Sequence, residues 1–242
     1  MMQSLIDLIF TAGNTHVAFQ PIFAIRGEPE LHSFECLTRG PEGTSLQSAE
    51  VLFEYVRRKG CEPAVDRQCV AACLRLAGRW PGFRYSLNVH AATLERDRDF
   101  GQLLLETAAQ HGLKPTQLIV ELVEFVPAFS EACEQAIGSL RRQGVEFALD
   151  DIGCGQANYQ MILRCQPDYF KVDRYIVAGS GADASRRAVL SSICQMAHDM
   201  GGTVVAEGVE CPEDLAAVRS VGVDLAQGFL LGRPEPVPVA AP

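Results

Sequence analysis

Short apolar runs rich in β-branched and aromatic residues alternate with longer amphipathic stretches along the chain. The runs predict strands at Val17–Ile25, Leu31–Arg39, Arg84–Ala91, Leu118–Glu124, Glu146–Asp151, Tyr169–Arg174, Thr203–Val209 and Leu225–Phe229. Apolar positions at helical spacing predict helices at Ser48–Arg58, Val65–Ala77, Glu95–His111, Ser130–Gln143, Ala157–Arg164, Ala184–Met200 and Pro212–Val221. Gly112, Gly144 and Gly222 follow three of these helices, where a glycine cap belongs.

This alternation predicts an α/β fold, a TIM-like (β/α)8 barrel with a mostly parallel sheet. The first two strands are joined only by the few residues around Arg26–Pro29, whereas a parallel pair needs a crossover of about a dozen. We therefore expect an antiparallel first strand. We expect residues 1–242 to form one domain, with an N-terminal helix over 1–13 and a C-terminal tail over 234–242.

Composition narrows the class of partner. The formal net charge of -9 argues against a protein that binds duplex nucleic acid, and the main basic cluster is Arg57–Lys59. An anionic substrate would need a metal ion or local cations to approach this acidic chain. No run approaches the roughly 18 apolar residues of a membrane span. The nine cysteines lack zinc-site spacing, which favours reduced thiols in a cytoplasmic protein.

Polar residues stand at the ends of the predicted strands, where barrels of this kind carry their active sites. Leu-Ile-Val precedes Glu121 and Phe-Ala-Leu precedes Asp150, so these carboxylates follow buried runs. One such carboxylate could belong to an ordinary salt bridge. The whole set indicates a site for a hard divalent cation: it comprises Glu35, near which the second strand is expected to end, and Asn88, Glu121, Glu124, Asp150, Asp151, Lys171, Asp173, Glu207, Glu210 and Gln227.

Asp150 and Asp151 are adjacent, and neighbouring residues of a strand normally point to opposite faces. They can reach one site only if the strand ends and turns there, as Gly153 and Gly155 suggest. Such a pair can serve two metals, which would activate a water and clamp a phosphoryl group. Lys171 can hold that water or neutralise phosphoryl charge.

In this order, the motifs resemble the EAL-domain family, the cyclic di-GMP phosphodiesterases, over nearly the whole chain. They are Phe19-Gln20-Pro21-Ile22, Glu35-Cys36-Leu37-Thr38-Arg39, Ser86-Leu87-Asn88-Val89, Glu121-Leu122-Val123-Glu124, Asp150-Asp151-Ile152-Gly153-Cys154-Gly155, Phe170-Lys171-Val172-Asp173, Ala206-Glu207-Gly208-Val209-Glu210 and Gln227-Gly228-Phe229. Cys36 replaces the family's Ala, Ile152 replaces its Phe, and residues 156–159 differ from its usual pattern.

The resemblance implies hydrolysis of cyclic di-GMP to linear pGpG with Mg²⁺ or Mn²⁺, inhibited by Ca²⁺, in a homodimer. It implies a first metal on Glu35, Asn88, Glu121 and Asp150, and a second on Asp150, Asp151 and Glu207. Lys171 would contact the catalytic water, and Glu124 would brace the loop after the fifth strand. The residues shaping the substrate site or its surroundings would be Gln20, Leu37, Arg39, Asp173, Glu210 and Gln227.

Two other hypotheses remain. The barrel could be a receptor that binds cyclic di-GMP, or a protein partner, without cutting. It could also be a Schiff-base enzyme that uses Lys171, although surrounding carboxylates would keep that amine protonated.

Overall fold

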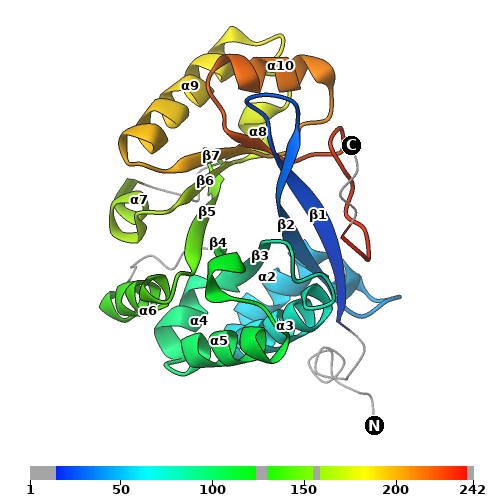
Figure 1. Ribbon diagram of the computed structural model, residues 1–242, viewed down its shortest axis with the longest axis vertical. Coiled ribbons are helices and arrows are strands. Elements are labelled where there is room, and N and C mark those ends of the chain that lie inside the picture. Colours follow the sequence, from blue (N-terminus) through cyan, green and yellow to red (C-terminus); the bar gives the residue numbers. More distant parts are fainter. Residues whose placement is uncertain (1–14, 124–129, 155–158, 239–242) are drawn as a thin grey trace.

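Eight strands close into one barrel in chain order (Figure 1). This computed structural model describes residues 15–123, 130–154 and 159–238. The strands are β1 (His16–Ala24), β2 (Glu30–Arg39), β3 (Tyr85–His90), β4 (Leu118–Val123), β5 (Glu146–Ile152), β6 (Tyr169–Val172), β7 (Thr203–Ala206) and β8 (Leu225–Ala226). The helix expected over 1–13 lies outside the described residues.

The first strand is reversed, as its short connection to the second predicts. β1 pairs antiparallel with both β2 and β8, and the six other neighbouring pairs of the barrel are parallel. The expected TIM-like barrel with an antiparallel first strand is therefore confirmed.

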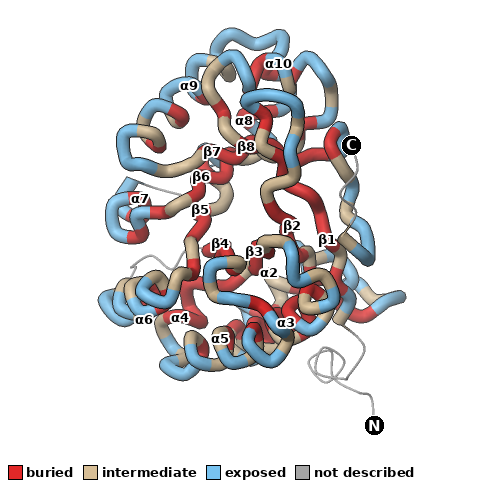
Figure 2. The backbone as a smooth tube through the Cα atoms, in the orientation of Figure 1, coloured by how far each residue is buried: buried red, intermediate tan, exposed pale blue. Residues whose placement is uncertain are grey.

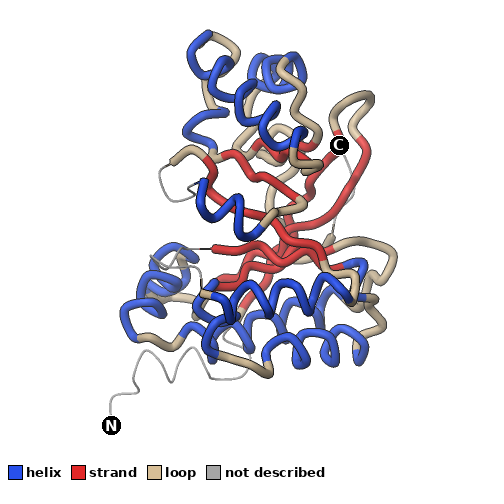
Figure 3. The backbone as a smooth tube through the Cα atoms, turned by 90° about the vertical axis from the view of Figure 1, so that its left-hand side faces the viewer, coloured by secondary structure: helices blue, strands red, loops and turns tan. Residues whose placement is uncertain are grey.

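Helices lie outside the strands, as the view from the side shows (Figure 3). They are α2 (Ala49–Lys59), α3 (Glu62–Ala77), α4 (Ala91–Arg96), α5 (Phe100–Gln110), α6 (Glu131–Arg142), α7 (Tyr159–Cys165), α8 (Arg174–Val177), α9 (Ala184–Asp199) and α10 (Pro212–Ser220), with 3₁₀ turns at Ser45–Gln47 and Pro115–Gln117. Gly112, Gly144 and Gly222 have positive φ angles just past three helices, as expected of C-terminal caps. Within the described ranges, the helices are too short or too polar to cross a bilayer.

The structure corrects two predicted elements. The helix predicted over Glu95–His111 is two helices, because Asp97 adopts an extended conformation between α4 and α5 and pairs with Arg67 of α3. The strand predicted to reach Arg174 ends at Val172, since Asp173 accepts a hydrogen bond from the backbone N–H of Tyr175 and begins the short helix α8.

Strand ends also differ from the prediction at three site residues. Glu35 lies in the middle of β2, not near its end, because β2 continues its pairing with β1 up to Arg39. Glu207 and Gln227 each follow directly after a strand, β7 and β8, that is shorter than expected.

Buried residues follow the strands of the barrel (Figure 2), and their side chains pack in one layer outside the barrel and one layer inside it. The larger layer packs between barrel and helices and includes Phe34, Val120 and Phe170. A separate cluster of Ile22, Ile119, Ala148, Tyr169, Val205 and Leu225 fills the barrel interior. Side chains two apart on a strand share a face, so Glu121 and Lys171 lie directly above Ile119 and Tyr169 of this cluster. The interior cluster therefore forms an apolar floor beneath the polar strand ends.

The C-terminal segment lies beside β1 (Figure 1). The backbone groups of Phe19 and Glu235 exchange hydrogen bonds of 2.7 and 3.0 Å. The second residue of the tail expected over 234–242 thus pairs with the barrel, and residues 239–242 lie outside the described ranges.

Candidate metal centre

Lys171 is the point on which the acidic side chains converge. It is 2% exposed, and its Nζ lies 2.6 Å from Glu121 Oε2, 2.7 Å from Glu207 Oε1, 3.3 Å from Asp150 Oδ1 and 3.8 Å from Glu35 Oε2. These carboxylates come from β4, β5 and β2 and from the residue after β7. The barrel therefore gathers groups that are far apart in the sequence around one buried ammonium.

Neighbouring strands hold Glu35 in a network of donors. Its Oε1 accepts a hydrogen bond of 3.1 Å from Asn88 Nδ2, and its Oε2 accepts one of 2.7 Å from Gln227 Nε2. Gln227 Nε2 also donates to Gln20 Oε1, at 3.0 Å. The register aligns Gln20 with Glu35 and Asn88 with Glu121, so the strand pairing itself places these groups together.

Glu121 has a partner that the sequence analysis missed. Ser86, buried on β3, donates a hydrogen bond from its hydroxyl to Glu121 Oε1, while Lys171 occupies Oε2. A serine inside an apolar strand run carries no signal of its own. Only the pairing of β3 with β4 makes it part of the site.

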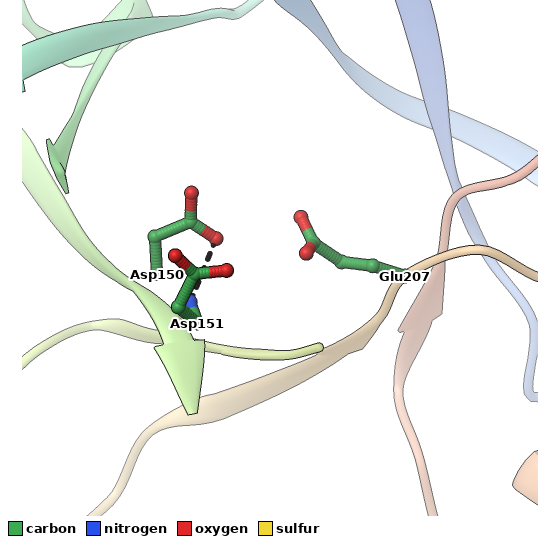
Figure 4. Close-up of side chains that lie close together, drawn as sticks. All are labelled: Asp150, Asp151 and Glu207. Carbon is green, nitrogen blue, oxygen red and sulfur yellow. Dashed lines mark hydrogen bonds between the residues drawn. The ribbon is translucent and has the colours of Figure 1, made fainter. Parts of the chain in front are cut away.

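Asp150 and Asp151 reach the same side of the barrel through a distortion within β5. Asp151 has a φ of 56°, and the pairing of β5 with β6 shifts register between Leu149 and Ile152. The strand was expected to end at Asp151. It instead continues through this bulge to Ile152. Asp150, Asp151 and Glu207 each offer an oxygen within 4.8 Å of the others, with Glu207 pointing at the aspartates from the opposite side (Figure 4).

Burial and charge shift the pKa values in this cluster. Burial would raise the pKa of Glu35, but the ammonium of Lys171 and the donors Gln227 and Asn88 outweigh it and lower that pKa. Burial, with help from the charge of Glu35, raises the pKa of Glu121 to about 8. Burial would lower the pKa of Lys171, but Asp150, Glu121 and Glu207 raise it well above its usual value. A protonated amine is a poor nucleophile, so this environment disfavours Schiff-base chemistry.

The donor set fits a hard divalent cation. Carboxylate and amide oxygens are the ligands that Mg²⁺ and Mn²⁺ take. A second positive charge among these side chains would also stabilise the ionised form of Glu121. The residues able to hold such ions are Glu35, Asn88, Glu121, Asp150, Asp151 and Glu207.

A pocket of about 210 Å³ opens beside this cluster. Its lining includes Gln20, Asp173, Glu210 and Gln227, four of the six residues expected at the substrate site. Leu37 and Arg39 lie farther along β2 and are not part of this lining, and Arg39 Nη1 donates to the carbonyl of Thr38. Glu124 lies outside the described residues.

Two large side chains of the lining were given no role in the sequence analysis. Arg174 brings a cation to the pocket, and Phe229 is 48% exposed there with the Arg233 guanidinium 4.3 Å from its ring centroid. Both positions were predicted as the last residues of strands, and Phe229 was noted only as part of a motif, so neither was expected at the site.

His90 is the last residue of β3, two positions after Asn88, and its side chain contacts helix α3. Its Nδ1 lies 2.8 Å from Asp66 Oδ1, and its backbone N–H donates to Asp66 Oδ2, also at 2.8 Å. This buried pair ties the end of β3 to α3 and so supports the strand that carries Asn88.

Comparisons with known proteins identify the family of this chain. The family model described as the EAL domain matches residues 3–234. A protein of Escherichia coli K12 named probable cyclic di-GMP phosphodiesterase PdeA is 33% identical over 209 residues, which cover 84% of this chain and 28% of that protein. The blue light- and temperature-regulated antirepressor BluF of the same organism is 31% identical over 150 residues, covering 61% of this chain and 37% of BluF.

A solved structure is also similar. Klebsiella pneumoniae BlrP1, in a complex with manganese and cyclic di-GMP at pH 6, superposes with a TM-score of 0.81 at 29% identity and covers 93% of this chain and 57% of that one. The chain spans about a third of the length of the two curated relatives. The match of the family model over residues 3–234 shows that the chain belongs to the EAL domain family.

Proposed function

We propose that this chain hydrolyses cyclic di-GMP to linear pGpG with Mg²⁺ or Mn²⁺. The observation that carries the proposal is the convergence of Glu35, Glu121, Asp150 and Glu207 on one buried point beside an open pocket. The name of the E. coli relative and the ligands in the BlrP1 complex support the substrate and the metal dependence.

Each residue of the centre has a proposed role. Glu35, Asn88, Glu121 and Asp150 would hold a first ion, and Asp150, Asp151 and Glu207 a second. Bound there, the ions would supply Lewis acidity to the phosphodiester and lower the pKa of a water. Lys171 would orient that water and offset phosphoryl charge. The hydrogen bonds from Asn88 and Gln227 keep Glu35 oriented and ionised for its role.

The pocket offers the means to bind the dinucleotide. Gln20, Asp173, Glu210 and Gln227 present hydrogen-bonding groups to it, and Arg174 adds a cation where a phosphate must approach an acidic protein. From the family resemblance, Leu37 and Arg39 would contact the substrate at its rim. Glu124 would brace the loop that follows β5.

Turnover by the purified chain tests this proposal. Cyclic di-GMP with Mg²⁺ or Mn²⁺ should give pGpG, measured by chromatography, and Ca²⁺ should suppress it. Glu35→Ala removes a ligand and should abolish product formation, whereas Glu50→Ala, an exposed carboxylate on α2, should not. Equal rates in Glu35→Ala and the parent chain would make the metal assignment wrong.

A receptor that binds without cutting is the alternative. The similarity to BluF, a protein named as an antirepressor, favours considering it. Calorimetry distinguishes the two functions, because a receptor would bind cyclic di-GMP while producing no pGpG with either metal. That pair of results would replace the phosphodiesterase proposal with the receptor.

We also propose that the protein works as a cytoplasmic homodimer. Tyr159 and Leu163 lie one turn apart on the same face of α7 and are 75% and 69% exposed, and a continuous exposed apolar face marks an interaction surface. Light scattering on a sizing column should give a dimer, and Leu163→Glu should shift it to a monomer. A dimer that persists in Leu163→Glu would exclude this face.

A further inference from the structure

The ammonium of Lys171 lies within contact of the oxygens that the proposed metal ions need. Its two nearest partners are Glu121 Oε2 at 2.6 Å and Glu207 Oε1 at 2.7 Å, and Asp150 Oδ1 follows at 3.3 Å. The residue is 2% exposed, so these carboxylates, and not bulk solvent, surround its charge.

A divalent ion and this ammonium require the same space. Mg²⁺ binds oxygen ligands at about 2.0–2.1 Å. An ion held by Glu121 Oε2 and Asp150 Oδ1 would therefore lie within a few ångströms of Nζ, and the two positive charges would repel each other at low dielectric. Lys171 must give up some of its contacts when an ion binds these oxygens.

The surrounding donors allow such a withdrawal. Glu35 keeps its hydrogen bonds from Asn88 and Gln227, and Glu121 keeps the hydroxyl of Ser86. The carboxylates would thus stay oriented while a cation of higher charge replaces the ammonium. These contacts make exchange of one cation for another possible without rearrangement of the strands.

We propose that Lys171 is the internal counter-ion of the acidic cluster and competes with divalent cations for the oxygens of Glu121, Asp150 and Glu207. Lys171 thereby sets the cation affinity of the site. This inference rests on the metal centre of the proposed function, and it assigns Lys171 a role in addition to contact with the catalytic water.

Binding of Mn²⁺ without any dinucleotide tests the competition. Isothermal titration calorimetry on Lys171→Met should give a dissociation constant at least about tenfold lower than that of the parent chain, since a nearby positive charge is removed. Lys171→Arg keeps the charge and should bind Mn²⁺ no more tightly than the parent. Lys114→Met, the same substitution at an exposed site, is the matched control and should leave the affinity unchanged.

Thermal unfolding gives a second readout. In EDTA, Lys171→Met should melt below the parent because its carboxylates lack their counter-ion, and Mn²⁺ should raise its Tm by more than it raises that of the parent. Lys171→Gln provides a second neutral variant, and the prediction applies to whichever of the two folds.

The outcomes separate this inference from the proposed function. If the parent binds Mn²⁺ and the neutral variants bind it equally or less well, the counter-ion role is wrong and the metal centre stands. If neither the parent nor the neutral variants bind Mn²⁺, both are wrong. If only the neutral variants bind it, the competition is supported and metal dependence of the parent fails.

Discussion

At the scale of the residue, the site is a balance of buried charges. Lys171 stays ionised in an almost fully buried position because Asp150, Glu121 and Glu207 raise its pKa. Burial has the opposite effect on Glu121, because it favours the neutral carboxyl group and raises its pKa to about 8. Small changes in donors around these groups should therefore have measurable effects.

Removal of one such donor gives a prediction at this scale. Ser86→Ala deletes the hydroxyl that donates to buried Glu121 Oε1, and it should lower the free energy of unfolding by about 1–3 kcal/mol. Urea denaturation measures the change. Ser192→Ala removes an exposed hydroxyl from α9 and should change the stability by less than about 0.5 kcal/mol. Equal effects of the two substitutions would show that the hydrogen bond to Glu121 contributes nothing special.

At the scale of the element, strand ends decide which side chains reach the centre. The order of strands and helices, and the reversal of β1, followed from hydrophobic patterning and from one short connection. The break at Asp97 could not be predicted, because its partner Arg67 lies on another helix. Glu121 and Asp150 were predicted because each follows an apolar run. Ser86 and Arg174 were missed because only tertiary contacts give them a role.

The bulge in β5 allows backbone and charge effects to be separated. Asp151 has a left-handed conformation, which Asn tolerates and a β-branched residue resists. Asp151→Asn should keep the stability of the parent, whereas Asp151→Val should lower it by about 1–2 kcal/mol. Urea denaturation reports the stability, and pGpG formation should fall strongly in both variants. Full activity in Asp151→Asn would remove Asp151 from the metal ligands.

At the scale of the whole molecule, the carboxylates of buried Asp214 and partly buried Asp224 tie distant segments together on the outside of the barrel. Asp214 on α10 accepts hydrogen bonds of 2.9 Å from the backbone N–H groups of Gly179 and Gly181. Asp224 accepts one of 2.9 Å from the backbone N–H of Val204 and lies 2.8 Å from His198 Nε2. These contacts join the loop after α8 to α10, and join α9 and β7 to the residue that precedes β8.

Acid should weaken these ties. Burial would raise the pKa of Asp214, but the N–H groups of Gly181 and Gly179 lower it below the usual value of about 3.9. Its contribution to stability is then complete above that value and is lost as the pH falls through the lower folded pKa. The Tm should fall below about pH 4, and Asp214→Asn should reduce this dependence on pH. A Tm profile in acid that is unchanged in Asp214→Asn would contradict the assignment.

The reversed first strand determines how a movement of the backbone before β1 can affect the metal centre. The register pairs His16 with Arg39, at the carboxyl end of β2, so the described chain enters the barrel at the rim that carries the metal centre. From there Gln20 is only four residues away, and it shares the side-chain amide of Gln227 with Glu35. A displacement of the backbone at Thr15 would therefore reach Glu35, a proposed metal ligand, through β1 and two hydrogen bonds. The path does not cross the barrel.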